Sequence, residues 1–64
     1  MKTLAEIGET LATERERAGY TQEGLAEKMG VSVISISRWE NGSNMKMDMI
    51  QQMVTALGIS ADYL

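Results

Sequence analysis

The side chains that carry most enzymatic and metal chemistry are scarce in this 64-residue sequence. It has no Cys and no His, which removes thiolate and imidazole ligands for a metal ion and also the commonest general base. Carboxylates are present, but pairs such as Glu14 and Glu23 have no His or basic nucleophile near them. We therefore expect no catalytic activity, no cofactor and no metal site.

The formal net charge of −3 weighs against a nucleic-acid partner, because phosphate contacts favour a basic surface. A locally basic face can nevertheless coexist with an acidic back, since affinity depends on where the charges lie. No apolar run approaches the roughly 20 residues that span a bilayer, and "MKTLAEIGETL" lacks the apolar region of a signal peptide. The sequence thus predicts one small cytoplasmic domain over residues 1–64.

Apolar residues recur at helical spacing along the chain, and five helices are expected from the residues that begin them. The N-cap candidates share a short polar side chain ahead of an apolar segment: Thr3, Thr21, Ser32, Asp48 and Ser60. Thr3 with Glu6, and Asp48 with Gln51, have the form of capping boxes. A longer loop is expected over residues 41–47. The predicted fold class is all-α, a compact bundle of five short helices.

The stretch "GVSVISISRWENG", residues 30–42, is the ambiguous part of this pattern. Its β-branched residues favour a strand by local propensity. A strand needs a partner, however, and no other segment of the chain reads as one. Read as a helix from Val33 to about Glu40, the segment places Ile36 and Trp39 on one face, which predicts a helix imposed by tertiary packing.

Residues 21–40 then form a helix-turn-helix, in which the first helix ends at Gly30 and the second follows Ser32. Ala26 is small where the second helix is expected to cross the first. Gly30 permits the left-handed conformation that such a turn needs. Gly8 is explained by a close approach of another element or by chance.

On these residues the chain resembles the helix-turn-helix domain of the Cro and phage-repressor (Xre-type) family of transcriptional regulators. The matching blocks, in order, are "YTQEGLAEKMGVS", "ISRWENG" and "ALGISADYL". The resemblance implies a lambda-repressor-like domain that binds a palindromic operator in double-stranded DNA as a homodimer. Repression is the expected form of regulation, and activation is the alternative. The helix after Ser32 would then enter the major groove.

The resemblance also implies roles for individual residues. Thr21 and Gln22 are expected at the DNA, where Gln22 would touch phosphate and brace a neighbouring base reader. Arg15 and Glu40 would form a partly buried ion pair. Expected on the exposed, groove-facing side of the recognition helix are Ser32, Val33, Ile34, Ser37 and Arg38. Expected at phosphates are Ser35, Asn41, Ser43 and Lys46.

Arg38 fits a guanine, whose O6 and N7 accept two parallel bonds from a guanidinium; a phosphate contact or a solvated side chain is the alternative. Val33 and Ile34 depart from the polar residues usual in the family. They could pack on thymine methyl groups, be tolerated, or form a patch for a protein partner. Arg17 and Lys28 are expected to be solvated.

Met45 and Met47 fit a dimer interface or a contact with the core. Two alternatives to a dedicated operator-binding protein stay open. The first is an antitoxin-type regulator that also binds a protein toxin, with Val33, Ile34, Met45 and Met47 exposed for the partner. The second is a protein-interaction module with weak DNA binding.

Overall fold

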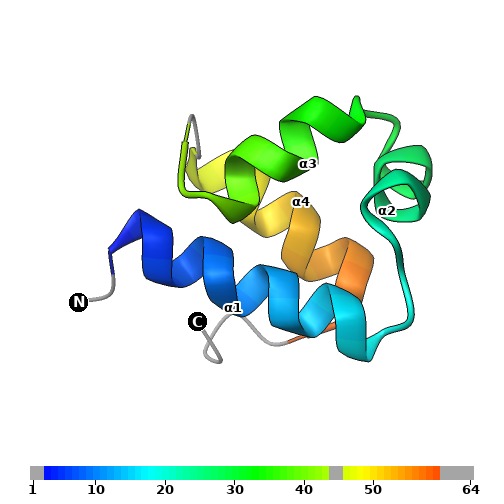
Figure 1. Cartoon of the computed structure of the whole chain (residues 1–64), viewed down its shortest axis with the longest axis horizontal. Helices are drawn as coiled ribbons and strands as arrows, with labels where there is room; N and C mark the ends of the chain where they lie inside the picture. The colour runs from blue at the N-terminus through cyan, green and yellow to red at the C-terminus, as the bar shows by residue number, and fades with distance from the viewer. Residues whose placement is uncertain (1–2, 44–45, 60–64) are drawn as a thin grey trace.

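The computed structural model describes residues 3–43 and 46–59, and these residues form four helices and no strand (Figure 1). The helices are α1 (Leu4–Arg17), α2 (Gln22–Met29), α3 (Val33–Glu40) and α4 (Met47–Leu57). The all-α class is confirmed, and the fifth helix expected after Ser60 lies outside the described residues. Across the described part of the chain, no helix is long and apolar enough to cross a membrane.

Three of the predicted N-caps are present. Glu6 N–H donates to Thr3 Oγ1 over 3.1 Å and Thr3 N–H donates to Glu6 Oε1 over 3.0 Å, which completes the capping box of α1. Thr21 accepts from Gly24 N–H at the start of α2. Ser32 caps α3 in the same way. Each side chain satisfies a backbone donor that the first turn of a helix leaves unpaired.

The capping box predicted at Asp48 is wrong. Helix α4 begins at Met47, with Lys46 in the N-cap position and no side-chain cap. Asp48 lies instead in the first turn of α4. A carboxylate there interacts favourably with the positive end of the helix dipole without accepting a capping hydrogen bond.

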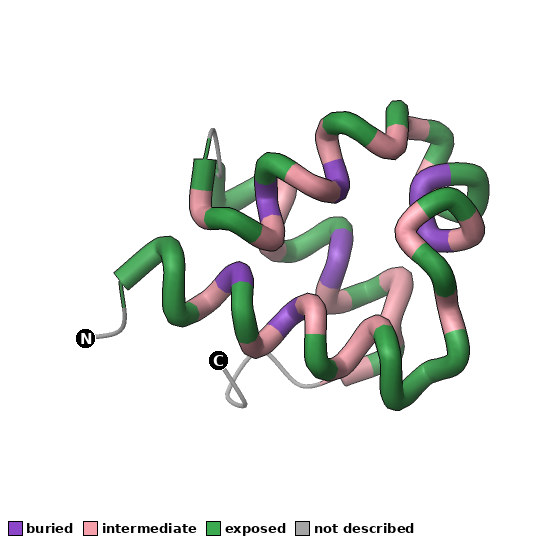
Figure 2. The backbone as a smooth tube through the Cα atoms, viewed as in Figure 1, coloured by how far each residue is buried: buried purple, intermediate pink, exposed green. Residues whose placement is uncertain are grey.

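The core draws side chains from all four helices, and Figure 2 shows a buried position on each of them. Its members have exposed fractions of 6% or less: Leu11, Leu25, Ala26, Ile36, Trp39 and Met53. Helices α1 and α2 each contact both α3 and α4. Burial of Ile36 and Trp39 confirms that the ambiguous segment is a helix with one apolar face, because this packing overrides its strand propensity.

Gly8 is where α1 meets the end of α3. A Cβ atom on Gly8 would lie 2.5 Å from the carbonyl oxygen of Trp39 and 2.6 Å from that of Glu40. The close approach considered for this glycine is therefore present. Because backbone meets backbone here, the absence of a side chain at Gly8 determines how near α3 lies to α1.

Candidate nucleic-acid interface

The two helices of the predicted helix-turn-helix are joined by the turn at Gly30. Gly30 has a φ of 72°, in the left-handed region that favours glycine, and the N–H of Val31 donates to the carbonyl of Ala26 over 3.0 Å. This bond satisfies a carbonyl in the last turn of α2 while the chain reverses into α3. Ala26 itself is 4% exposed, as a crossing point between two helices requires.

Helix α3 has one face in the core and one in solvent. Ile36 and Trp39 are buried, whereas Ile34 is 59% exposed and Arg38 is exposed. Ile34 and Arg38 are four residues apart, so they are neighbours on the helix surface. Ser32 is exposed and Ser37 is half-buried. The outward-facing side of α3 therefore carries the branched apolar side chain of Ile34 next to the guanidinium group of Arg38.

Val33 does not belong to that exposed side. It is half-buried and packs against the core. The reason is its spacing from Ile36: residues three apart share a helix face, so Val33 follows Ile36 inward. The expectation that Val33 is fully exposed is therefore wrong, and its contact with DNA or with a protein partner stays a prediction.

Ser32 and Ser35 interact with each other at the start of α3. Ser35 N–H donates to Ser32 Oγ over 3.2 Å, and the two hydroxyl oxygens are 3.0 Å apart. The pair fixes the first turn of the helix, which is the part that a helix-turn-helix directs toward base edges. Base contact by Ser32 and phosphate contact by Ser35 stay predictions.

Arg15 and Glu40 form the expected ion pair. Arg15 Nε donates to Glu40 Oε2 over 2.6 Å, and the two side chains are 12% and 7% exposed. Arg15 Nη1 also donates to the carbonyl of Tyr20 over 2.7 Å. The guanidinium thus ties α1 both to the end of α3 and to the segment that leads into α2.

Gln22 joins this network in a way that sequence reasoning missed. Its Nε2 donates to Glu40 Oε1 over 2.9 Å. The expected roles of Gln22, contact with phosphate and bracing of a neighbouring base reader, stay predictions. The carboxylate of Glu40 therefore accepts from α1 and α2 together while it belongs to α3, so it sets the relative orientation of all three helices.

The remaining residues expected at phosphates flank α3 in the chain. Thr21 is the N-cap of α2, and Asn41, Ser43 and Lys46 follow α3 in the chain. All four residues are exposed. Met45 lies outside the described residues. Met47 is 67% exposed, but it is the first residue of α4 and not part of the preceding loop.

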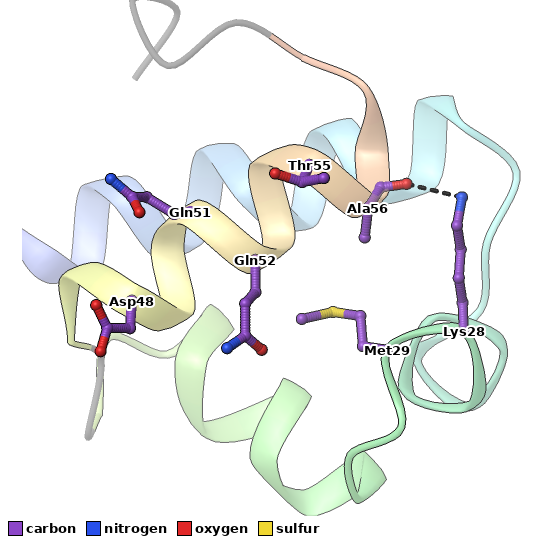
Figure 3. A pocket seen from close by; sticks show the side chains of 7 residues that line it. All are labelled: Lys28, Met29, Asp48, Gln51, Gln52, Thr55 and Ala56. Atoms are coloured by element: carbon purple, nitrogen blue, oxygen red, sulfur yellow. Dashed lines mark hydrogen bonds between the residues drawn. The ribbon is translucent and has the colours of Figure 1, made fainter.

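Lys28 is not simply solvated, contrary to expectation. Its Nζ donates over 2.8 Å to the hydroxyl of Tyr20 and over 2.8 Å to the carbonyl of Ala56 in the last turn of α4 (Figure 3). The C-terminal end of a helix attracts cations, because the carbonyl groups of its last turn have no partner within the helix. Figure 3 shows Lys28 and Asp48 at opposite ends of an open groove along α4, which Met29 and Gln52 also line.

These contacts leave few cations for a nucleic acid. Arg15 and Lys28 are engaged as described, and Arg17 Nη1 pairs with Glu14 over 3.1 Å. Among residues 3–43 and 46–59, Arg38 and Lys46 are the cations without an intramolecular partner. Arg38 lies on α3 and Lys46 in the N-cap position of α4, so both of these cations follow the turn of the helix-turn-helix in the chain.

Two capped helices joined by a left-handed turn, with a second helix that has one face in the core and one in solvent, define a helix-turn-helix domain. The family model described as helix-turn-helix matches residues 11–64. Over 62 residues the chain is 40% identical to the "Uncharacterized HTH-type transcriptional regulator YazB" of Bacillus subtilis (strain 168), covering 94% of this chain and 90% of that relative. No solved structure matches the chain. The chain belongs to the Xre-type helix-turn-helix family, whose members are DNA-binding regulators and not enzymes.

Proposed function

We propose that this chain is a transcriptional repressor that binds a palindromic operator as a homodimer, with α3 in the major groove. The observation that carries the proposal is the two-sided character of α3. Ile36 and Trp39 anchor the helix in the core, and Ile34 and Arg38 extend from its other side. A recognition helix needs both faces, because base edges are read only by side chains whose backbone is held in place.

Phosphate contacts would come from the two ends of the helix-turn-helix, before α2 and after α3. The N-terminus of α2, with Thr21 and Gln22, offers backbone N–H groups and a positive dipole end to an anion. After α3, the side chains of Asn41, Ser43 and Lys46 are exposed. Contacts at both ends fix the register of α3 on the duplex, which lets Arg38 donate to the same guanine in every complex.

The experiment that tests this function is selection of bound sequences from a random duplex pool. The expected result is an enriched inverted repeat with half-sites about 10 base pairs apart, the separation that a two-fold symmetric dimer imposes. Enrichment of a single half-site would support DNA reading and contradict the homodimer. No enrichment at any salt concentration would contradict the function itself.

A second function is favoured by the small number of free cations among residues 3–43 and 46–59 and by two exposed apolar side chains. Ile34 is 59% exposed and Met47 is 67% exposed. Apolar surface of this kind is typical of a protein interface. In this function, the domain would bind a partner protein, such as the toxin of an antitoxin-type pair, and would hold DNA weakly. The salt dependence of duplex binding distinguishes the two functions, as set out in the Discussion.

A further inference from the structure

The outer face of α3 offers two side chains of different chemistry to whatever it meets. Ile34 is its large exposed apolar residue, since Val33 is turned to the core. Arg38 is exposed and has no partner among the residues that the structure describes. The serines nearby are partly committed: Ser32 and Ser35 bond to each other. Ile34 and Arg38 are therefore the pair that determines what this face recognises.

The major groove contains a matching pair of features. The C5 methyl group of thymine is the apolar group that base edges present there, and guanine presents O6 and N7 as adjacent acceptors. An apolar side chain gains by covering the methyl, and a guanidinium gains by bonding both guanine acceptors. A protein partner would have to supply an apolar pocket and an anion side by side. The major-groove edge of a duplex already presents an apolar methyl group close to a pair of hydrogen-bond acceptors.

The spacing of the two residues limits where those bases lie. Four residues of α-helix span about 6 Å along the axis. Successive bases of one strand are about 3.4 Å apart. With the extra reach of an arginine side chain, the two contacts lie within about three base-pair steps of each other.

We propose that Ile34 and Arg38 read a thymine methyl group and a guanine, respectively, within about three base-pair steps in each operator half-site. This inference rests on the proposed function and deepens it, because it names the bases that the site selects. Ile34 then determines specificity by shape and apolar contact, without a hydrogen bond. Arg38 determines it through hydrogen bonds.

The test removes one methyl group from the DNA. In the duplex selected by the wild-type protein, each thymine of a half-site is replaced in turn by deoxyuridine, which lacks only the C5 methyl. We expect one position at which this replacement lowers wild-type affinity by about threefold to tenfold, the effect of losing one buried methyl contact. Ile34→Ala should bind the thymine and uracil duplexes equally well.

Leu4→Ala is the matched control. Leu4 is apolar like Ile34, is 45% exposed, and belongs to α1, so it is not part of the outer face of α3. This variant should keep the full sensitivity to deoxyuridine. Thermal unfolding of both variants checks that neither loses its fold, which is expected because both side chains are largely in solvent.

The guanine is tested in the same way. Replacing guanines with 7-deazaguanine removes the N7 acceptor and should weaken wild-type binding at one position within three steps of the sensitive thymine. Arg38→Ala should be indifferent to that replacement. If an operator is enriched and bound but no thymine responds to methyl removal, or if Ile34→Ala responds as the wild type does, the inference is overturned while the proposed function stands. If no duplex is bound at all, the proposed function fails first.

Discussion

Gln22 at the start of α2 and Glu40 at the end of α3 are joined by a hydrogen bond of 2.9 Å. The same carboxylate accepts from Arg15 over 2.6 Å, so one side chain links three helices. In a helix-turn-helix, α2 positions the unit on the phosphates and α3 reads the bases. The bond between Gln22 and Glu40 therefore couples the positioning part of the interface to the reading part.

Replacing Glu40 with Gln should destabilise the domain. The change leaves the guanidinium of Arg15, in a side chain only 12% exposed, without its anion. We expect a loss of about 1.5–3 kcal/mol in the free energy of unfolding, the usual scale for a hydrogen bond to a charged group. Urea denaturation measures it. Glu27→Gln removes an exposed carboxylate of α2 and is the control; equal losses in the two variants would contradict the structural role of Glu40.

Gly8→Ala should be destabilising although alanine favours helices. The new Cβ would lie 2.5 Å from the carbonyl oxygen of Trp39, and this backbone atom cannot move without shifting α3. Overpacking of this kind costs about 1–3 kcal/mol. The control is Gly24→Ala, where the nearest atom is 3.1 Å away and belongs to the Thr21 side chain. The melting temperature should fall further for Gly8→Ala, and the reverse order would refute the contact.

Ile36→Ser should unfold the domain, whereas Ile34→Ser should leave it folded. Ile36 is 0% exposed and Ile34 is 59% exposed, so the same substitution buries an unpaired hydroxyl at one position only. The loss of a buried branched side chain costs roughly 2–5 kcal/mol, which is most of the stability of so small a domain. Circular dichroism at 222 nm, a helix signal, would separate the two variants. Similar melting curves would mean that the faces of α3 are misassigned.

Arg38→Ala and Lys46→Ala should weaken operator binding in different ways. Loss of Arg38 should cost roughly 1–3 kcal/mol and relax the preference at one base pair. Loss of Lys46 should weaken binding to all sequences by a similar factor and reduce the salt slope by about 1 for each protomer, or about 2 for the dimer. Fluorescence anisotropy with matched and single-mismatch duplexes measures both. A uniform loss for Arg38→Ala would assign that residue to phosphate.

The wild-type protein should also show a shallow salt dependence. Each protomer has two described cations without a partner, Arg38 and Lys46, so a dimer brings four to the DNA. Counterion release then gives a slope of about −4 in log affinity against log salt. A slope close to zero would favour the protein-binding function. A much steeper one would mean that Arg17 or Lys28 leaves its present partner to meet phosphate.

Local patterns in the sequence were enough to place most of the fold. Thr3, Thr21 and Ser32 begin helices as expected, because an N-cap depends on neighbours within one turn. Residues 33–40 have the local propensity of a strand, and the sequence predicts a helix there only because it offers no second strand with which they could pair. Val33 could have been placed inward from its spacing to Ile36, since a three-residue separation is visible without a structure.

Other contacts had no signal in the sequence. Lys28 reaches the carbonyl of Ala56, 28 residues away, and Gln22 reaches Glu40, 18 residues away. Such bonds depend on how helices are placed in space, and neither propensity nor periodicity contains that information. The pair of Arg15 and Glu40 was expected only because related domains have charged residues in the same places. Asp48 is not the cap because α4 begins at Met47, two residues earlier than a cap at Asp48 would place it.

The shortage of unengaged cations has a consequence for how such a regulator would search a chromosome. Random genomic DNA competes with an operator through its phosphates, and that competition grows with the number of charges a protein presents. With Arg38 and Lys46 as the described cations left for this purpose, encounters with unrelated sequence would be brief. Under the proposed function, few molecules would be sequestered by bulk DNA, and a small cellular pool of repressor would be enough to keep its target occupied.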